Sequence, residues 1–178
     1  AGGIELAHRS AVSTPPVADS RFDVVREERA PRRKRAGDEL DNLVDAQVRD
    51  PQPDRETKIK RQIRSHRLRN NGSWVNNYYD DMAWLALALE RAGRLAGVEK
   101  PGALKKLCDQ FINAWVPEDG GGIPWRKQDQ FFNAPANGPA GIFLARYDER
   151  LRRAQQMADW IDETLIDPET HLVFDGIK

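Results

Sequence analysis

Hydrophobic residues recur along the first part of this chain with a period close to that of an α-helix. In residues 38–50 the apolar positions are Leu40, Leu43, Val44 and Val48, and Pro51 ends the pattern. Residues 54–69 repeat the pattern in a more charged form, with apolar positions at Ile59, Ile63 and Leu68. Both segments are therefore expected to be amphipathic helices with a narrow apolar stripe.

The next two segments are more apolar. Residues 78–95 are hydrophobic all round the helical axis, because alanines separate Met82, Trp84, Leu85, Leu87 and Leu89. A helix of this kind is usually buried on all sides. Pro101, at a favourable first-turn position, begins a further helix whose apolar positions are Leu104, Leu107, Phe111, Ile112 and Trp115.

Residues 117–139 interrupt the helical pattern with glycines, prolines, amides and aromatic residues. A connection of this length exceeds the usual 4–6 or so residues, and long loops are often functional. From residue 140 to 166 a helical pattern returns, with a break expected near Asp148, and residues 171–177 are expected to be extended. Successive helices joined as antiparallel hairpins, with almost no strand signal, predict an all-α fold.

Residues 1–37 carry no sustained helical period and are expected to form a flexible, basic N-terminal arm, with the folded domain over residues 38–178. The basic cluster at residues 32–35 could bind phosphates. We interpret it as a solvated stretch, because no aromatic residue alternates with the charges as a nucleic-acid stacking platform would require.

Composition narrows the possible partners. The 178 residues, 39% of them hydrophobic, suffice for one domain with a core. Lysine and arginine (28) balance aspartate and glutamate (28), so any charged partner must bind a local charged patch and not the protein's overall charge. No nucleic-acid partner is expected.

Cys108 is the only cysteine and is expected to be a small core residue. No apolar stretch approaches the roughly 20 residues of a membrane span, and the compartment stays undecided.

Two consecutive carboxylates, Asp80 and Asp81, begin the most apolar helix. One interpretation is helix capping, in which Asn76 or Asn77 caps the helix and each carboxylate gains roughly 0.3–1 kcal/mol from the helix dipole. Capping leaves unexplained why both carboxylates adjoin a buried helix, where they lose hydration. Two carboxylates crowded in a partly dry site repel one another, and one is then ionised and the other protonated at neutral pH, as a glycosidase requires.

Neighbouring helical residues can hold their carboxyl groups on the order of 5–6 Å apart, close to the retaining geometry of about 5–5.5 Å. One aspartate would attack the anomeric carbon of a sugar, and the other would protonate the departing oxygen and then activate water. The predicted substrate-binding residues are aromatic rings for stacking on sugars and amides for bonding hydroxyls: Asn77, Tyr78, Trp125, Asn133 and Asn137.

The stretches "WVNNYYDDMAWLALALERAG", "GGGIPWR" and "NAPANGPAGIFLAR" resemble, in this order and spacing, glycoside hydrolase family 76, the endo-α-1,6-mannanases. The resemblance implies a partial (α/α)6 toroid of antiparallel helical hairpins, about half of the family domain. It also implies a groove that binds α-1,6-linked mannan, cleaved with retention and without a metal or other cofactor. By analogy Asp80 is the nucleophile and Asp81 the acid/base, Asn133 and Asn137 line the groove, and Trp125 lies beside it.

This chain departs from the family pattern at three places. Phe132 stands where members often carry a lysine, the segment ahead of "LVDAQ" does not follow the family, and members continue through further hairpins after "VFDGI". An open toroid leaves apolar helix faces exposed to water. A partner chain or a missing C-terminal half is therefore expected to cover it.

Alternative functions remain open at this point. The main one is a non-catalytic carbohydrate-binding or scaffold protein derived from the same toroid. A sugar isomerase or epimerase would need histidine bases, and only His8, His66 and His171 are present. The sequence thus predicts a retaining glycosidase with Asp80 and Asp81 as its catalytic pair, and binding without hydrolysis of mannan would favour the main alternative.

Overall fold

The computed structural model describes residues 36–117, 120–147 and 150–178. Its helices are α1 (Ala36–Arg49), α2 (Arg55–Arg69), α3 (Tyr79–Ala96), α4 (Pro101–Asn113), α5 (Ala134–Arg146) and α6 (Leu151–Leu165). Two short strands, β1 (Phe132–Asn133) and β2 (Gly176–Ile177), pair antiparallel. The expected N-terminal arm lies outside the described residues, except that its last two residues, Ala36 and Gly37, belong to α1.

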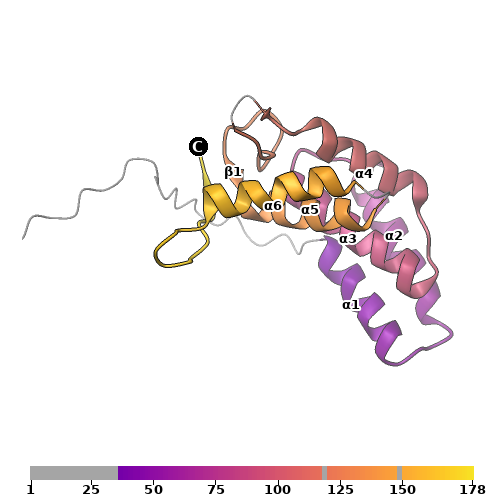
Figure 1. Ribbon diagram of the computed structural model, residues 1–178. Coiled ribbons are helices and arrows are strands. Elements are labelled where there is room, and N and C mark those ends of the chain that lie inside the picture. The colour runs from indigo at the N-terminus through magenta and orange to yellow at the C-terminus, as the bar shows by residue number, and fades with distance from the viewer. Residues whose placement is uncertain (1–35, 118–119, 148–149) are drawn as a thin grey trace, which may run out of the picture.

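The helices form two layers (Figure 1). In the inner layer α3 packs against α1 on one side and against α5 on the other. In the outer layer α2, α4 and α6 each pack against the helix that precedes them in the chain. Three consecutive helical hairpins therefore lie side by side, as in part of a two-layered helical toroid, and the prediction of an all-α fold is confirmed.

The inner helices α1 and α3 run in the same direction. At the start of α1, a Cβ on Gly37 would lie 3.0 Å from the backbone carbonyl of Trp84, so the two helices approach closely here and a larger residue would push them slightly apart. Further along both helices, Arg91 of α3 pairs with Asp41 and Asp45 of α1. The starts of the two helices therefore lie at the same end of the molecule.

The helix α5 follows the same direction. Its last residue, Arg146, lies 3.9 Å from the carboxylate of Glu90, far along α3, and its start adjoins the loop that contacts the start of α3. The amino-terminal ends of all three inner helices therefore gather at one end. Because each carries a partial positive charge, this end favours carboxylates and other anions.

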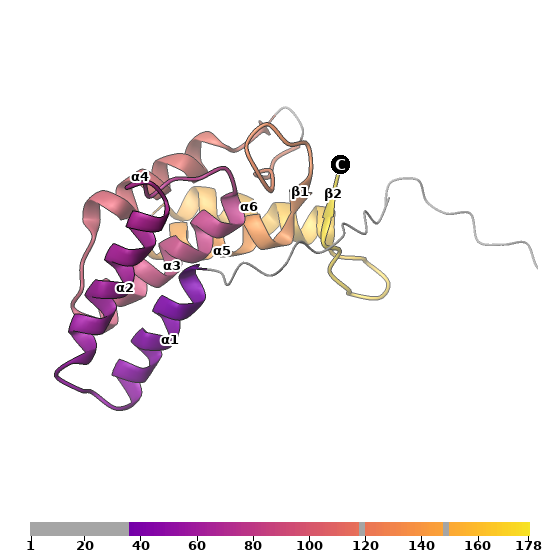
Figure 2. The ribbon, with the colours of Figure 1, turned by 180° about the vertical axis from the view of Figure 1, so that it is seen from behind.

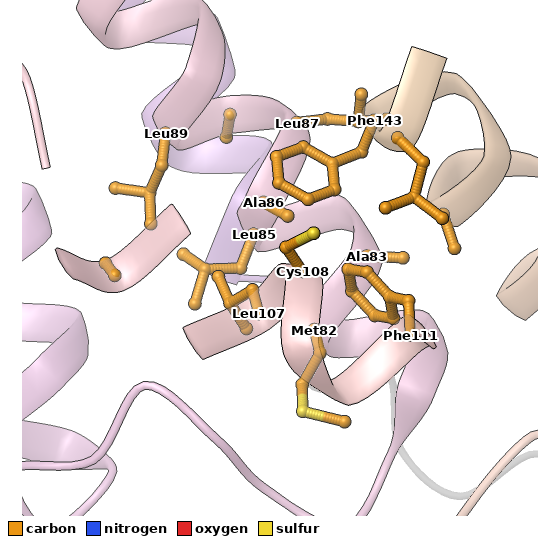
Figure 3. Close-up of a cluster of buried hydrophobic side chains, with 14 of the residues drawn as sticks. Met82, Ala83, Leu85, Ala86, Leu87, Leu89, Leu107, Cys108, Phe111 and Phe143 are labelled. Carbon is orange, nitrogen blue, oxygen red and sulfur yellow. The ribbon is translucent and has the colours of Figure 1, made fainter. Parts of the chain in front are cut away.

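The helix α3 lies at the centre of the hydrophobic core, as Figure 3 shows. Leu85 and Leu89 share one side of the helix and Leu87 lies on the opposite side, and their side chains are 3%, 0% and 8% exposed, respectively. The prediction that this helix is buried on all sides is confirmed for residues 85–90, whereas Leu95, near the end of the helix, is 39% exposed. Cys108 of α4 is 3% exposed among the same side chains, which confirms its expected place in the core.

The apolar stripes of α1 and α2 are shorter than their sequences suggest. Leu40 and Val44 are buried, as are Ile59 and Ile63, but Val48 is 53% and Leu68 is 66% exposed. Leu68 is five residues after Ile63, about 140° around the helix, so it points away from the core. None of the described helices is long and apolar enough to cross a membrane.

The long connection ends earlier than expected. The helix α5 begins at Ala134, so Asn137 and Pro139 belong to a helix and not to a loop. The prediction was wrong because prolines and a glycine in residues 133–139 indicate a loop, although Pro135 stands in the first turn of α5, where proline is well tolerated, and Pro139 lies inside the helix. The break near Asp148 is confirmed, since α5 ends at Arg146 and α6 begins at Leu151.

Candidate active site

The two consecutive aspartates lie in the first turn of α3, and both are partly buried. The Asp80 Oδ1 accepts the backbone N–H of Asp81 at 2.8 Å, which fixes the orientation of the Asp80 carboxylate. The Asn76 Nδ2 lies 3.4 Å from Asp81 Oδ2. The pair therefore sits at the helix end where the dipole favours negative charge, next to an amide donor.

The capping interpretation of this turn needs correction. Tyr78, in an extended conformation, occupies the N-cap position, and its side chain makes no capping hydrogen bond. Asn76 instead accepts the Tyr78 backbone N–H at 2.8 Å through its Oδ1, so it shapes the turn that leads into the helix.

The connection between α4 and α5, which contains Gly120, Gly121 and Gly122, lies beside the aspartate pair. The Tyr79 N–H donates to the Trp125 carbonyl at 2.8 Å, and the Lys127 N–H donates to the Asn77 carbonyl at 2.8 Å. Between these bonds Tyr78 and Arg126 form an antiparallel bridge. Because these contacts use backbone atoms, they place the connection beside the aspartates largely independently of its side chains.

The aromatic rings of Tyr78 and Trp125 meet edge to face, with centroids 5.4 Å apart. The guanidinium of Arg126 lies 5.6 Å from the centroid of the Trp125 ring. Its Nε donates to Asp129 Oδ2 at 2.7 Å. The ring of Trp125 is thus held between a second aromatic ring and a cation that is itself fixed by a carboxylate.

Two ionisable groups of the connection between α4 and α5, Arg126 and Asp129, have shifted pKa values. Burial alone would raise the pKa of Asp129, but hydrogen bonds from Arg126 and from the backbone N–H groups of Gln130 and Phe131 outweigh it and lower the pKa. The same ion pair raises the pKa of Arg126. The Arg126–Asp129 pair is therefore charged throughout the neutral range.

The amides of Asn133 and Asn137 differ from the expected groove-lining groups. Asn137 is 0% exposed, and its side chain bonds both backbone groups of Ile123 and the carbonyl of Asn133. Asn133 is 4% exposed, and its Oδ1 caps α5 by accepting the Ala136 N–H at 3.2 Å. In this structure a sugar cannot reach Asn137. Its amide holds the connection to α5.

Glycines let the connection pass close to two tryptophans. Gly121 and Gly122 have φ of 114° and 90°, in the region that favours glycine. A Cβ on Gly121 would lie 2.7 Å from the Trp115 ring, and one on Gly122 would lie 2.8 Å from the Trp160 ring. The ring of Trp160 thus supports the connection from the α6 side.

Of the residues predicted for the site, Asn77, Tyr78, Asp80, Asp81 and Trp125 come together at the start of α3. Sequence patterns did not point to Asn76 or Asp129 as members of the site. Asn76 lies inside the "NNYYDD" stretch, whereas no pattern marks Asp129 except its spacing from Arg126. Within the described residues no group of three or more His, Cys, Asp or Glu side chains is placed to hold a metal ion.

Both the sequence and the fold of this chain are similar to those of known proteins. The model of glycosyl hydrolase family 76 matches residues 35–178. An α-1,6-mannanase from Salegentibacter sp. HEL1_6 is 30% identical with a TM-score of 0.76, over 85% of this chain and 47% of that one. An inactive variant of that enzyme, with two consecutive aspartates changed to asparagine, is in complex with α-1,6-mannotriose. It is 30% identical with a TM-score of 0.75, over 80% of this chain and 44% of that one.

The Lin0763 protein from Listeria innocua is 25% identical with a TM-score of 0.72, over 80% of this chain and 43% of that one. The chain spans about half the length of these solved structures, at 43% to 47%. A comparison with curated proteins finds no match.

Proposed function

This chain belongs to glycosyl hydrolase family 76, and from that premise we propose that it hydrolyses α-1,6-linked mannan with retention of configuration, using Asp80 and Asp81. Its three hairpins are part of the (α/α)6 toroid of the family. The substrate class is proposed from the mannanases that the chain resembles. The roles of Asp80 and Asp81 are proposed by analogy with the family, and their position at the start of α3 supports them as the pair.

The observation that carries the proposal is the position of one aspartate pair. Asp80 and Asp81 are the only consecutive aspartates in the sequence. The similar Salegentibacter enzyme is inactive when two consecutive aspartates are replaced, and that variant is in complex with α-1,6-mannotriose. In this chain the pair lies at the gathered amino-terminal ends of the inner helices, beside an aromatic wall. A carboxylate pair at such a place suits glycoside hydrolysis.

We assign the first chemical step to Asp80. Its carboxylate, oriented by the Asp81 N–H, attacks the anomeric carbon and forms a glycosyl ester. Asp81 gives its proton to the departing glycosidic oxygen. Asp81 then takes a proton from water, the water attacks the anomeric carbon, and Asp80 leaves as a carboxylate. Two displacements at one carbon retain its configuration.

The proposed sugar contacts come from the residues around this pair. The Trp125 ring, held by Tyr78 and Arg126, offers an apolar face on which a mannose ring can stack. Asn77 is exposed and its amide can bond hydroxyl groups. Asn137 is proposed as a positioning residue instead of a sugar contact, because it is fully buried.

We further propose that the missing half of the toroid completes the groove, as a further part of the same protein or as another chain. The last hairpin and the segment after it expose several large apolar side chains: Ile142, Leu151, Leu172 and Val173. Apolar surface of this kind is expected where a further hairpin packs.

A non-catalytic carbohydrate-binding protein is the second candidate, because the paired rings of Tyr78 and Trp125 can hold a sugar without any reaction at the aspartates. Incubation of the chain with α-1,6-mannan separates the two functions. The proposal predicts release of α-1,6-mannooligosaccharides that first appear as the α-anomer by proton NMR, and no release from an α-1,4-linked glucan control. Binding of mannan without release would establish the second candidate, and early release of the β-anomer would reject retention.

A further inference from the structure

The helix α2 is strongly basic although the chain as a whole is neutral. Its 15 residues include seven lysines and arginines and only one acidic residue, Glu56, which gives a formal charge of +6 in a chain of net charge 0. The charge is therefore concentrated on one element. A local concentration of this kind creates a field that the net charge of the protein conceals.

Part of this charge has no carboxylate partner. Lys58 pairs with Asp54 and Lys60 pairs with Glu56, whereas Arg61 and Arg64 are exposed and make no ion pair in the described part of the chain. Carboxylates of the neighbouring helix α1 could have neutralised α2. Two of them, Asp41 and Asp45, pair with Arg91 of α3 instead.

The side chains of Arg61 and Arg64 point away from the inner layer. Ile59 and Ile63 are 0% and 2% exposed in the core, on the side of α2 that packs against α1. Arg61, Arg64 and Leu68 are spaced i, i+3, i+7 and share the opposite side of the helix. Figure 2 shows α1 and α2 together at one end of the molecule, away from the strands. We call the stripe of Arg61, Arg64 and Leu68 the outward face of α2.

We propose that the outward face of α2 docks the protein on an anionic phospholipid surface. Phosphate headgroups attract clustered lysine and arginine side chains, and each such residue near the surface strengthens binding. Leu68, 66% exposed between arginines, can enter the apolar boundary of a bilayer while the guanidinium groups stay at the headgroups. Since Ile59 and Ile63 remain in the core, docking requires no unfolding of α2.

Two observations favour a membrane over a soluble polyanion. An exposed leucine gains free energy from a bilayer, but it gains nothing from a phosphate polymer in water. No aromatic residue occurs within α2, so the face lacks the stacking platform that single-stranded nucleic acids require. Docking would hold the hydrolytic site near glycans that are attached to such a surface.

Co-sedimentation of the 178-residue chain with vesicles tests this proposal without any assay of hydrolysis. The chain should bind vesicles of phosphatidylcholine with phosphatidylglycerol, but not vesicles of phosphatidylcholine alone, and salt at about 0.5 M should weaken binding. The double variant Arg61→Glu, Arg64→Glu should bind at least about tenfold more weakly. The double variant Lys105→Glu, Lys106→Glu, on exposed positions of α4, makes the same charge change and should retain binding.

The variant Leu68→Ser separates the membrane from a soluble polyanion. It should weaken vesicle binding by about threefold to tenfold, while binding of soluble polyphosphate stays unchanged. Circular dichroism of every variant verifies that the helices form. The proposal is overturned if the wild-type chain does not bind the anionic vesicles, if both double variants lose binding equally, or if Leu68→Ser binds vesicles as the wild type does.

Discussion

The side-chain amide of Asn137 bonds both backbone groups of Ile123: its Oδ1 accepts the N–H and its Nδ2 donates to the carbonyl, each at 2.8 Å. The same Nδ2 donates to the carbonyl of Asn133 at 2.9 Å. Ile123 is two residues before Trp125, whose carbonyl bonds the N–H of Tyr79. One buried amide thus links the start of α5 to the turn that carries the aspartate pair.

Asn137→Ala is expected to lower the free energy of unfolding by at least about 2 kcal/mol, because it leaves buried backbone groups of Ile123 without partners. Urea denaturation measures this change. The control Asn113→Ala, at an exposed position at the end of α4, should change stability by less than about 0.5 kcal/mol. Equal effects of the two variants would show that the Asn137 amide does not hold the connection.

Two glycines of the connection form a matched pair for a second prediction. Gly120 and Gly122 have φ of 85° and 90°, so alanine is similarly strained at both. Only at Gly122 would the new Cβ meet a ring, that of Trp160 at 2.8 Å. Gly122→Ala is therefore expected to lower the melting temperature clearly more than Gly120→Ala. A similar decrease for both would mean that Trp160 does not support the connection as described.

Trp125→Ala is expected to weaken binding of α-1,6-mannotriose by about threefold to tenfold, the usual contribution of an aromatic contact. The bond between the Trp125 carbonyl and the Tyr79 N–H uses backbone atoms, so the fold around the aspartates should persist. Isothermal titration measures the affinity, and Trp125→Phe should restore most of it. Undiminished affinity of the alanine variant would remove Trp125 from the proposed sugar site.

The pH dependence of stability should report on His66. Burial lowers its pKa below the ordinary 6.5, with a further decrease from Arg69, and its Nε2 is buried without a hydrogen-bond partner among the described residues. The unfolded chain therefore binds this proton more readily than the folded chain does. Above pH 6.5 the contribution of neutral His66 to the free energy of unfolding is fully present. As the pH falls from 6.5 towards the lowered folded-state pKa, the unfolded chain takes up the proton first, and the free energy of unfolding decreases.

Urea denaturation of the wild type and of His66→Gln between about pH 7.5 and 5.5 isolates this contribution from other titrating groups. The wild type should lose stability relative to the variant as the pH falls. Parallel curves would contradict the assignment, because they would mean that His66 has the same pKa in the folded and unfolded chains.

Local patterns predicted the helices of this chain well. The all-round hydrophobicity of residues 78–95 predicted a central helix, and Leu87 is indeed buried on the side opposite Leu85 and Leu89. The end of the long connection was predicted wrongly, because Pro135 and Pro139 indicate a loop in isolation although both lie within α5. Helical periodicity could not show this, since the first turn of α5 contains a proline, is capped by Asn133, and is tied to Ile123 through the side chain of Asn137.

The candidate site was only partly predictable for a similar reason. Asp80 and Asp81 are adjacent in sequence, so their proximity needs no tertiary contact. Trp125 is 44 or more residues away, and backbone bonds to Asn77 and Tyr79 bring its segment to the pair. The amide of Asn137 was expected to face a ligand, but its burial depends on the path of a distant glycine-rich segment that no local pattern describes.

The most direct test of the central claim is the rate of α-1,6-mannotetraose hydrolysis by Asp80→Asn, by Asp81→Asn and by the control Asp109→Asn, an exposed position on α4. Each change in the pair should decrease the rate by at least about 10³-fold, while the control should match the wild type and all variants should keep the helical circular dichroism spectrum. Hydrolysis at the wild-type rate by either variant of the pair would contradict the assignment of the catalytic carboxylates.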